Sequence, residues 1–188
     1  MVKTHPQHTN QVRIIGGVHR GRKISFPSAD GLRPTADSVR ERLFNWLGQD
    51  LTGMSVLDLF AGSGVLGLEA ASRHAEQVIM VEMNRLVAAA IKDNQTKLQL
   101  GQINIVCTDA FNFLAKNKKQ FQIIFVDPPY AWKQWDLLLR ELVKHMLPQA
   151  RVYLESDALP TLPAGWTILK QGKSGKSRFA LLVYEPEV

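Results

Sequence analysis

Short apolar runs and longer segments of helical periodicity alternate along the chain from residue 55 onward. Apolar runs of strand length occupy 55–59, 77–82, 103–107, 121–126 and 151–155. Between them, apolar side chains recur every three to four residues in the segments 65–73, 85–99, 110–117 and 134–146. This alternation predicts an α/β fold in which helices cover both faces of a mostly parallel sheet.

The pattern changes near the end of the chain. Apolar runs at 166–169 and 179–184 have no helical segment between them, and the intervening 171–177 is rich in glycine and lysine. We expect a closing β-hairpin with its loop at 171–177. One of the last strands should therefore run antiparallel to the rest of the sheet.

The N-terminal part is organised differently. Runs at 13–15 and 23–26 are separated by glycines and arginines and predict a β-hairpin. A turn follows, and Thr35 is in a suitable position to cap the next helix, which has one apolar face. We expect residues 1–52 to form an extension (tail, hairpin and helix) that leans on a main domain of residues 53–188.

The first strand of the main domain runs directly into a glycine turn. The sequence from residue 56 is Val-Leu-Asp-Leu-Phe-Ala-Gly-Ser-Gly-Val-Leu-Gly, with glycines at Gly62, Gly64 and Gly67. A strand, a glycine turn and a helix N-terminus form the nucleotide cradle of doubly wound folds, because glycine leaves no Cβ between backbone and ligand. The spacing also fits the dinucleotide fingerprint, so an NAD-binding unit stays open at this point.

Two acids indicate a different ligand. Asp58 ends the first strand, where a carboxylate would repel a pyrophosphate but suit a cationic group, such as the amino-acid end of S-adenosylmethionine. Glu82 ends the second strand, where an acid typically accepts hydrogen bonds from a ribose diol.

A second motif follows the strand at 121–126, in the order Asp127-Pro128-Pro129-Tyr130. Two prolines remove two N–H donors and fix an extended turn, which leaves the Asp127 carboxylate and the Pro128 carbonyl as acceptors. Such acceptors suit the two protons of an exocyclic amino group, while the Tyr130 ring would stack on a planar base. An ordinary Pro-Pro turn is the alternative.

Together these motifs resemble the amino-group methyltransferases that use S-adenosylmethionine. The N-terminal blocks Arg-Ile-Ile-Gly-Gly from residue 13, Leu-Arg-Pro-Thr from 32 and Val-Arg-Glu-Arg-Leu-Phe-Asn-Trp-Leu from 39 resemble the RsmD family of bacterial 16S ribosomal RNA guanine-N2 methyltransferases. The resemblance extends over about residues 13–184. It implies a Rossmann-like class I methyltransferase fold in residues 53–188, with seven strands in the order 3-2-1-4-5-7-6. It also implies that the guanine is the one for which the family is named.

The resemblance assigns roles to individual residues. Asp127 would polarise the amino group or accept its proton, the Pro128 carbonyl would be a backbone acceptor, and Tyr130 would stack. The residues expected to bind the cofactor are Asp58, Phe60, Gly62, Gly64, Glu82, Met83, Asp109 and Ala110. For Asp109 a helix N-cap is the alternative, and for Met83 simple packing. Trp132 and Trp135 would either edge the base pocket or belong to the core.

The charge distribution also indicates a binding partner. The chain carries a net charge of +6, and residues 1–42 hold eight Lys or Arg against three acids. The segment 170–178 adds four more positive charges. Concentrated basic charge indicates a phosphate-backbone partner, although a solvated basic face is the alternative. The arginines expected to contact RNA are Arg13, Arg20, Arg22, Arg33 and Arg40, with Arg33 and Arg40 also shaping the substrate pocket. A surface ion pair with Glu41 or Asp37 is the alternative for Arg40.

The expected partner is 16S ribosomal RNA within an assembled or assembling small subunit, bound by a cytoplasmic monomer without membrane or metal. His5 and His8 in the tail provide no ligand set for a metal. The single cysteine, Cys107, excludes an internal disulfide and is expected to be a small buried residue. The rival functions are adenine-N6 methylation of RNA or DNA, glutamine-N5 methylation of a protein, and a non-catalytic role in RNA binding or assembly.

Overall fold

The computed structural model describes residues 9–186. Two strands and one helix come first: β1 (Thr9–Arg13) and β2 (Lys23–Pro27), separated by the 3-10 turn η1 (Gly17–His19), and then α1 (Asp37–Leu47). The elements that follow are β3 (Ser55–Asp58), α2 (Val65–Ser72), β4 (Gln77–Val81), α3 (Arg85–Leu98), β5 (Ile103–Val106), α4 (Ala110–Lys116), β6 (Phe121–Val126), α5 (Trp135–Leu142), η2 (Val143–His145), β7 (Met146–Ser156), β8 (Trp166–Ser174) and β9 (Ser177–Tyr184).

The last seven strands form one sheet in the order β5-β4-β3-β6-β7-β9-β8. β9 pairs antiparallel with both β7 and β8, and the other pairings are parallel. This confirms the α/β class, the antiparallel closing hairpin and the strand order that the resemblance implied. The strand order reverses between β3 and β6, the position at which open α/β sheets bind ligands.

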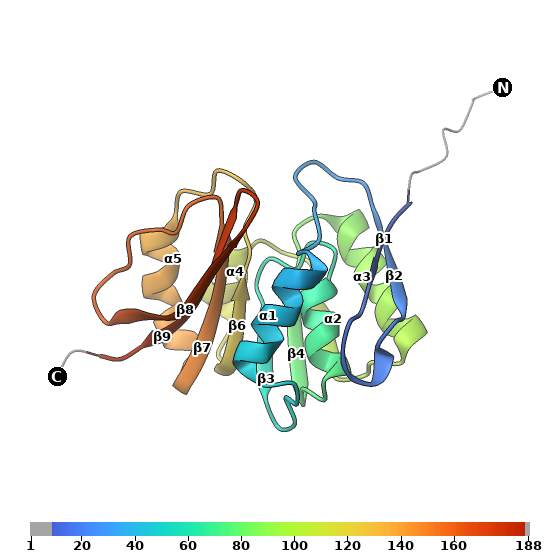
Figure 1. Cartoon of the computed structure of the whole chain (residues 1–188), viewed down its shortest axis with the longest axis horizontal. Coiled ribbons are helices and arrows are strands. Elements are labelled where there is room, and N and C mark those ends of the chain that lie inside the picture. Colours follow the sequence, from blue (N-terminus) through green and yellow to red (C-terminus); the bar gives the residue numbers. More distant parts are fainter. Residues whose placement is uncertain (1–8, 187–188) are drawn as a thin grey trace.

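Each central strand supplies side chains to two cores. Val56, Ile123 and Tyr153 belong to the core under α1, α2 and α3, whereas their chain neighbours Leu57, Ile124 and Val152 belong to the core under α4 and α5. This alternation follows from the period of two in a strand, and both cores are needed because the sheet is covered on both faces. Figure 1 shows α1 and α2 on one side of the sheet and α4 and α5 on the other.

The N-terminal segment packs into the first of these cores. Ile14, Ile24, Leu43 and Phe44 are at most 1% exposed and join the same hydrophobic cluster as α2 and the central strands. The turn of the hairpin lies on the C-terminal end of α2, where Ser72 Oγ donates to the Gly16 carbonyl at 2.7 Å. The following residue, Gly17, has φ of +73°, and a Cβ there would lie 1.9 Å from the Ser72 carbonyl oxygen.

A buried ionic cluster fixes α1 to α2. The Arg40 guanidinium and the Glu69 carboxylate are both 0% exposed and lie 2.6 Å apart. Glu69 also pairs with Arg73 at 3.2 Å and accepts the backbone N–H of Ile15 at 2.6 Å. Buried charges are tolerated only when paired and hydrogen-bonded in this way, so the cluster holds α1, α2 and the hairpin in one arrangement.

Several boundaries differ from the sequence predictions. β1 begins at Thr9, four residues before the first run of the expected hairpin, because it pairs with the whole of β2. β7 extends over Met146–Ser156, and the expected long helix ends at Leu142. Residues 171–174 belong to β8, so the expected long loop between the last strands is a tight turn at Gly175 (φ +57°).

Two single-residue predictions need separate mention. Cys107 is exposed rather than buried, because β5 ends at Val106 and the chain then leaves the sheet. His5 and His8 lie outside the described residues. Within residues 9–186, no group of three or more His, Cys, Asp or Glu side chains is arranged to hold a metal ion. None of the helices in that part of the chain is long and apolar enough to cross a membrane.

Candidate active site

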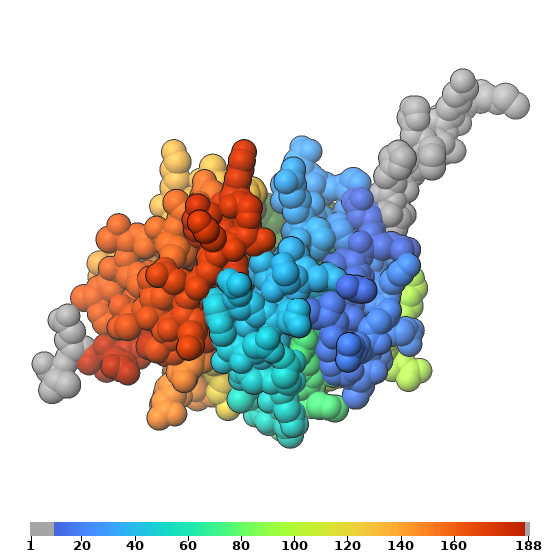
Figure 2. Space-filling view, in the orientation of Figure 1, coloured from blue at the N-terminus to red at the C-terminus, as the bar shows by residue number. Residues whose placement is uncertain are grey.

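The carboxyl ends of the central strands open into a cavity of about 710 Å³. Its floor and walls come from the segments that follow β3, β4, β5 and β6 and from the end of β7, and its rim is formed by residues 29–36 and the β8–β9 turn. Figure 2 shows the hollow between the light-blue segment that precedes α1 and the red-orange β8–β9 hairpin. The volume is typical of a site for a small organic ligand.

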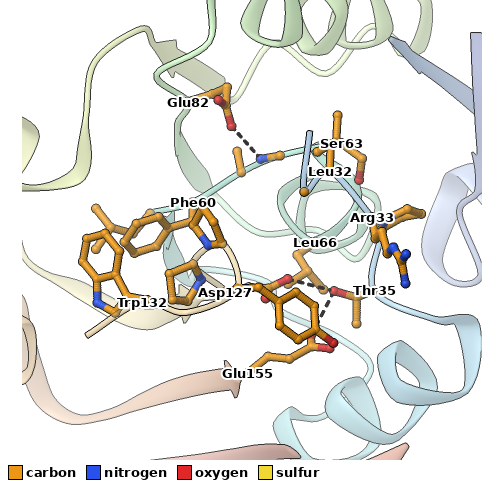
Figure 3. Close-up of a pocket in the computed structure, with 18 of the residues that line it drawn as sticks. Leu32, Arg33, Thr35, Phe60, Ser63, Leu66, Glu82, Asp127, Trp132 and Glu155 are labelled. Carbon is orange, nitrogen blue, oxygen red and sulfur yellow. Dashed lines mark hydrogen bonds between the residues drawn. The ribbon is translucent and has the colours of Figure 1, made fainter. Parts of the chain in front are cut away.

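One half of the cavity is built around Glu82. Its carboxylate accepts the backbone N–H of Gly62 at 2.9 Å (Figure 3) and that of Asn84 at 2.8 Å, so it ties the glycine turn to the end of β4. Gly62 has φ of +55°, and a Cβ there would meet Leu32 at 3.1 Å. The turn therefore needs glycine to leave room on this side of the cavity.

Asp58 and Gly64 lie behind the cavity wall and do not line it. The Asp58 carboxylate is 1% exposed and accepts the Gly67 N–H at 3.0 Å, in the first turn of α2. Burial raises the pKa of Asp58 to about 7, against the lowering effect of this hydrogen bond. The structure thus does not bring the Asp58 carboxylate to the cavity surface, where the sequence reasoning had expected it to meet the ligand.

Met83, Asp109 and Ala110 line the outer part of the same half. Met83 is 72% exposed. Asp109 caps α4, since its carboxylate accepts the Asn112 N–H at 3.0 Å, and this hydrogen bond holds the pKa of Asp109 below its usual value. The N-cap alternative for Asp109 is therefore observed, and its cofactor role stays a prediction.

An aromatic cluster forms part of the cavity wall. The Phe60 and Trp132 rings meet edge to face at a centroid distance of 5.1 Å, and Phe111 stacks on Trp132 at 6.0 Å and 17°. Trp132 Nε1 is buried without a hydrogen-bond partner among the described residues, although its side chain lines the cavity. Trp135 lines the cavity as well.

The other half holds two carboxylates. The parallel register pairs Val126 with Leu154, so the next residues along β6 and β7 are Asp127 and Glu155. Because side chains alternate, both acids lie on the face of Phe125 and Tyr153, toward the chain that precedes α1. Burial holds the pKa of Asp127 well above its usual value, and the negative charges of Glu155 and then Asp58 raise this pKa further.

Thr35 lies between these acids. Its hydroxyl is 3.3 Å from Asp127 Oδ2 and 3.2 Å from Glu155 Oε2 (Figure 3). The prediction that Thr35 caps α1 is wrong: the N-cap is Ala36, and the Thr35 side chain turns into the cavity instead. Thr35 and Glu155 are the site residues that sequence reasoning missed, and an acid at the end of a parallel strand was the available signal for Glu155.

Pro128 and Tyr130 follow Asp127 on the cavity wall. Pro128 is buried, whereas Tyr130 is 61% exposed at the rim. Tyr130, Arg33 and Lys176 also line a hollow of about 500 Å³ that adjoins the cavity. The structure thus places an aromatic ring and two cationic side chains from separate segments at one entrance.

The expected RNA-contacting arginines divide into four groups. Arg40 is fully buried, because its guanidinium bonds the Thr35 and Arg13 carbonyls and Glu69, so the prediction that it contacts RNA is corrected. Arg13 is exposed but pairs with Asp37 at 2.8 Å. Arg20 and Arg22 are exposed at the hairpin turn, near the end of α2 that points away from the cavity. Only Arg33 lines the cavity.

The chain is similar over nearly its whole length to known proteins. The family described as conserved hypothetical protein 95 matches residues 12–183. "Ribosomal RNA small subunit methyltransferase D" of Escherichia coli K12 is 38% identical over 192 residues, which cover 100% of this chain and 97% of that protein.

Solved structures give the same picture. "Putative methyltransferase yhhF from Escherichia coli" superposes with a TM-score of 0.85 at 38% identity, covering 94% of this chain and 99% of that one. A putative methyltransferase complexed with SAH has a TM-score of 0.71 and covers 96% of this chain and 57% of that one, but at 16% identity this likeness concerns the fold alone.

Proposed function

This chain belongs to the RsmD family, described as conserved hypothetical protein 95, and from that premise we propose that it methylates the exocyclic N2 of a guanine in 16S ribosomal RNA. The methyl donor is S-adenosylmethionine. The observation that carries the proposal is the Asp127-Pro128-Pro129-Tyr130 turn, whose acceptors and ring line one half of a cavity that has a glycine cradle in the other half.

The residues in the half of the cavity around Glu82 fit S-adenosylmethionine. The Gly62 backbone approaches the cavity without a side chain, and the Glu82 carboxylate lies at the end of β4, where it would accept a ribose diol. Met83, Asp109 and Ala110 would hold the adenine, and Trp132 Nε1 offers an unused donor. Asp58 would act from behind the wall through its negative charge. When bound, the cofactor supplies an electrophilic methyl group.

The chain's own residues would position the amino group and stabilise the charge that develops on it. Asp127 would accept one N–H of the guanine amino group and the Pro128 carbonyl the other, which directs the nitrogen lone pair out of the ring plane. Such positioning can be worth about 7–11 kcal/mol. The raised pKa of Asp127 makes its carboxylate a better acceptor for the proton that the nitrogen loses. The exposed Tyr130 ring would stack on the base.

The rim supports an RNA partner. Arg33 and Lys176 are exposed on opposite sides of the entrance, one before α1 and one in the β8–β9 turn, and both would contact phosphates around an extruded base. We propose that the target is the RNA of an assembled or assembling small subunit, because the small basic rim is suited to a target whose folded shape contributes to recognition. We also propose that the protein acts as a monomer in the cytoplasm.

The test is transfer of labelled methyl from S-adenosylmethionine to small subunits from a strain that lacks the modification, followed by nucleoside analysis. N2-methylguanosine is the expected product, and Asp127→Asn should lower the rate by about 100- to 1,000-fold. Asp93→Asn is the matched control, because Asp93 is exposed on α3 and does not line the cavity. N6-methyladenosine as the product would favour the adenine alternative. Labelled protein with unlabelled RNA would refute both the guanine proposal and the adenine alternative.

A further inference from the structure

Thr35 has one hydroxyl proton but lies within hydrogen-bond distance of two carboxyl groups. Its Oγ1 is 3.3 Å from Asp127 Oδ2 and 3.2 Å from Glu155 Oε2. A hydroxyl donates one proton, so at most one of the two carboxylates is satisfied by Thr35 at a time. The Asp127–Glu155 pair therefore retains acceptor capacity toward the cavity that both side chains line.

Glu155 is held more firmly than a solvent-exposed acid. Its Oε2 accepts from the Tyr153 hydroxyl at 2.9 Å, and its Oε1 accepts from the Ser177 hydroxyl at 2.8 Å. With Thr35, these donors come from β7, β9 and the segment before α1. A carboxylate has about four acceptor positions, and the three hydroxyls leave one of them free. The free position is on Oε1, the oxygen that receives a single hydrogen bond.

We propose that Glu155 accepts the N1–H of the target guanine while Asp127 accepts from its N2, so that this carboxylate pair selects guanine over adenine. The inference rests on the proposed function and adds its specificity determinant. On its Watson–Crick edge guanine presents N1–H and the N2 amino group as adjacent donors, which match two carboxylates that both lie within 3.3 Å of the Thr35 hydroxyl. Reading an extruded base by this edge is the usual means of discrimination in such sites.

Adenine would meet the same pair with a mismatch. Next to its amino group adenine has an unprotonated N1, whose lone pair would face the Glu155 carboxylate. Two buried acceptors without a proton between them are unfavourable, and sites built to pair with a donor reject analogues that lack it by large factors. The arrangement therefore combines an attractive contact to guanine with a repulsive one to adenine.

The experiment removes the N1 donor of the base and keeps its N2 amino group. The O6 carbonyl is lost at the same time, so the Glu155→Gln variant separates the contribution of N1 from that of O6. Small subunits are reconstituted with 16S RNA that carries either guanine or 2-aminopurine at the target position. 2-Aminopurine keeps the N2 amino group, but its N1 is an acceptor. We expect the wild-type protein to prefer guanine by about 10- to 150-fold in kcat/KM, the range expected for one lost hydrogen bond to a charged group.

Glu155→Gln should then reduce this preference to within a few-fold. The glutamine amide has both a donor and an acceptor, so it can pair with either base. Glu76→Gln is the matched control, since Glu76 is exposed and does not line the cavity, and it should keep the wild-type ratio. A residue with only a structural role would lower both rates equally and leave the ratio unchanged.

The outcomes separate the two proposals. If the wild-type protein methylates guanine and 2-aminopurine at equal rates, the specificity role is refuted whether or not the variant folds. An unchanged ratio in a folded Glu155→Gln protein refutes it as well. Absence of methylated guanine from the wild-type reaction overturns the proposed function, and the specificity role with it.

Discussion

The buried Asp58 carboxyl gives a quantitative prediction about stability. Its pKa rises from 3.8 to about 7 on folding, chiefly because burial disfavours the charged form. The folded chain therefore binds a proton over a pH range in which the unfolded chain has released it. The free energy of unfolding of the cofactor-free protein should fall as pH rises from about 4 to about 7, by up to about 1.4 kcal/mol per pH unit.

Asp58→Asn removes this titration and keeps the shape. The amide oxygen can still accept the Gly67 N–H, at present 3.0 Å from Oδ2. Relative to the parent, the variant should gain roughly 4 kcal/mol at pH 8 and less than half of that at pH 5, both upper limits from the size of the pKa shift. The same substitution should weaken cofactor binding, since the negative charge behind the wall is lost.

The assay is equilibrium urea unfolding of the cofactor-free parent and variant at pH 5 and pH 8, followed by far-UV circular dichroism. Asp93→Asn serves as the control, because Asp93 is exposed on α3, and its effect should be small at both pH values. A stability difference between Asp58→Asn and the parent that is the same at pH 5 and pH 8 would refute the reasoning, because the difference would then not come from the Asp58 proton.

Three further predictions concern the extension and the rim. Arg40→Ala leaves Glu69 charged and underpaired in the core, so urea unfolding should show a loss of about 3–5 kcal/mol. Gly17→Ala requires a strained φ of +73° and places a Cβ 1.9 Å from the Ser72 carbonyl oxygen, so the melting temperature should fall, whereas an unchanged value would exclude this clash. Arg33→Ala should weaken binding to small subunits and reduce its salt dependence, measured by filter binding at several salt concentrations; an unchanged salt slope would remove Arg33 from the interface.

The sheet and the half of the cavity around Glu82 were predictable, because the sequence patterns that indicate them are local. The alternation of apolar strands and helices gives the parallel sheet, and an acid or a glycine turn at a strand end identifies its ligand-binding edge. Gly62, Glu82 and Asp127 lie where these local patterns place them. Asp58 differs, because strand periodicity indicates which face a side chain takes but not whether the next helix covers it.

The half of the cavity around Asp127 and Glu155 could not be predicted in full, because its arrangement depends on contacts that no local sequence pattern reveals. Thr35 precedes a helix and resembles an N-cap, yet its hydroxyl partners lie 92 and 120 positions later in the chain. Arg40 next to Glu41 resembles the exposed face of an amphipathic helix, and it is buried because Glu69 on α2 supplies the opposite charge. When two residues are this far apart in the sequence, their contact cannot be predicted from local patterns, even when each residue is identified separately.

The same separation has a consequence for the order in which the protein acquires its abilities during synthesis. Translation delivers the chain from its N-terminus, so Thr35 and the glycine turn after β3 emerge long before Glu155. β7, which carries Glu155, lies between β6 and β9 and has both neighbours only once the final strand is made. β3, which leads into the glycine turn, lies between β4 and β6, and both of these strands precede β7 in the chain. Under the role proposed for Glu155, base discrimination requires that nearly all of the chain has left the ribosome, the particle whose RNA is modified by relatives of this chain.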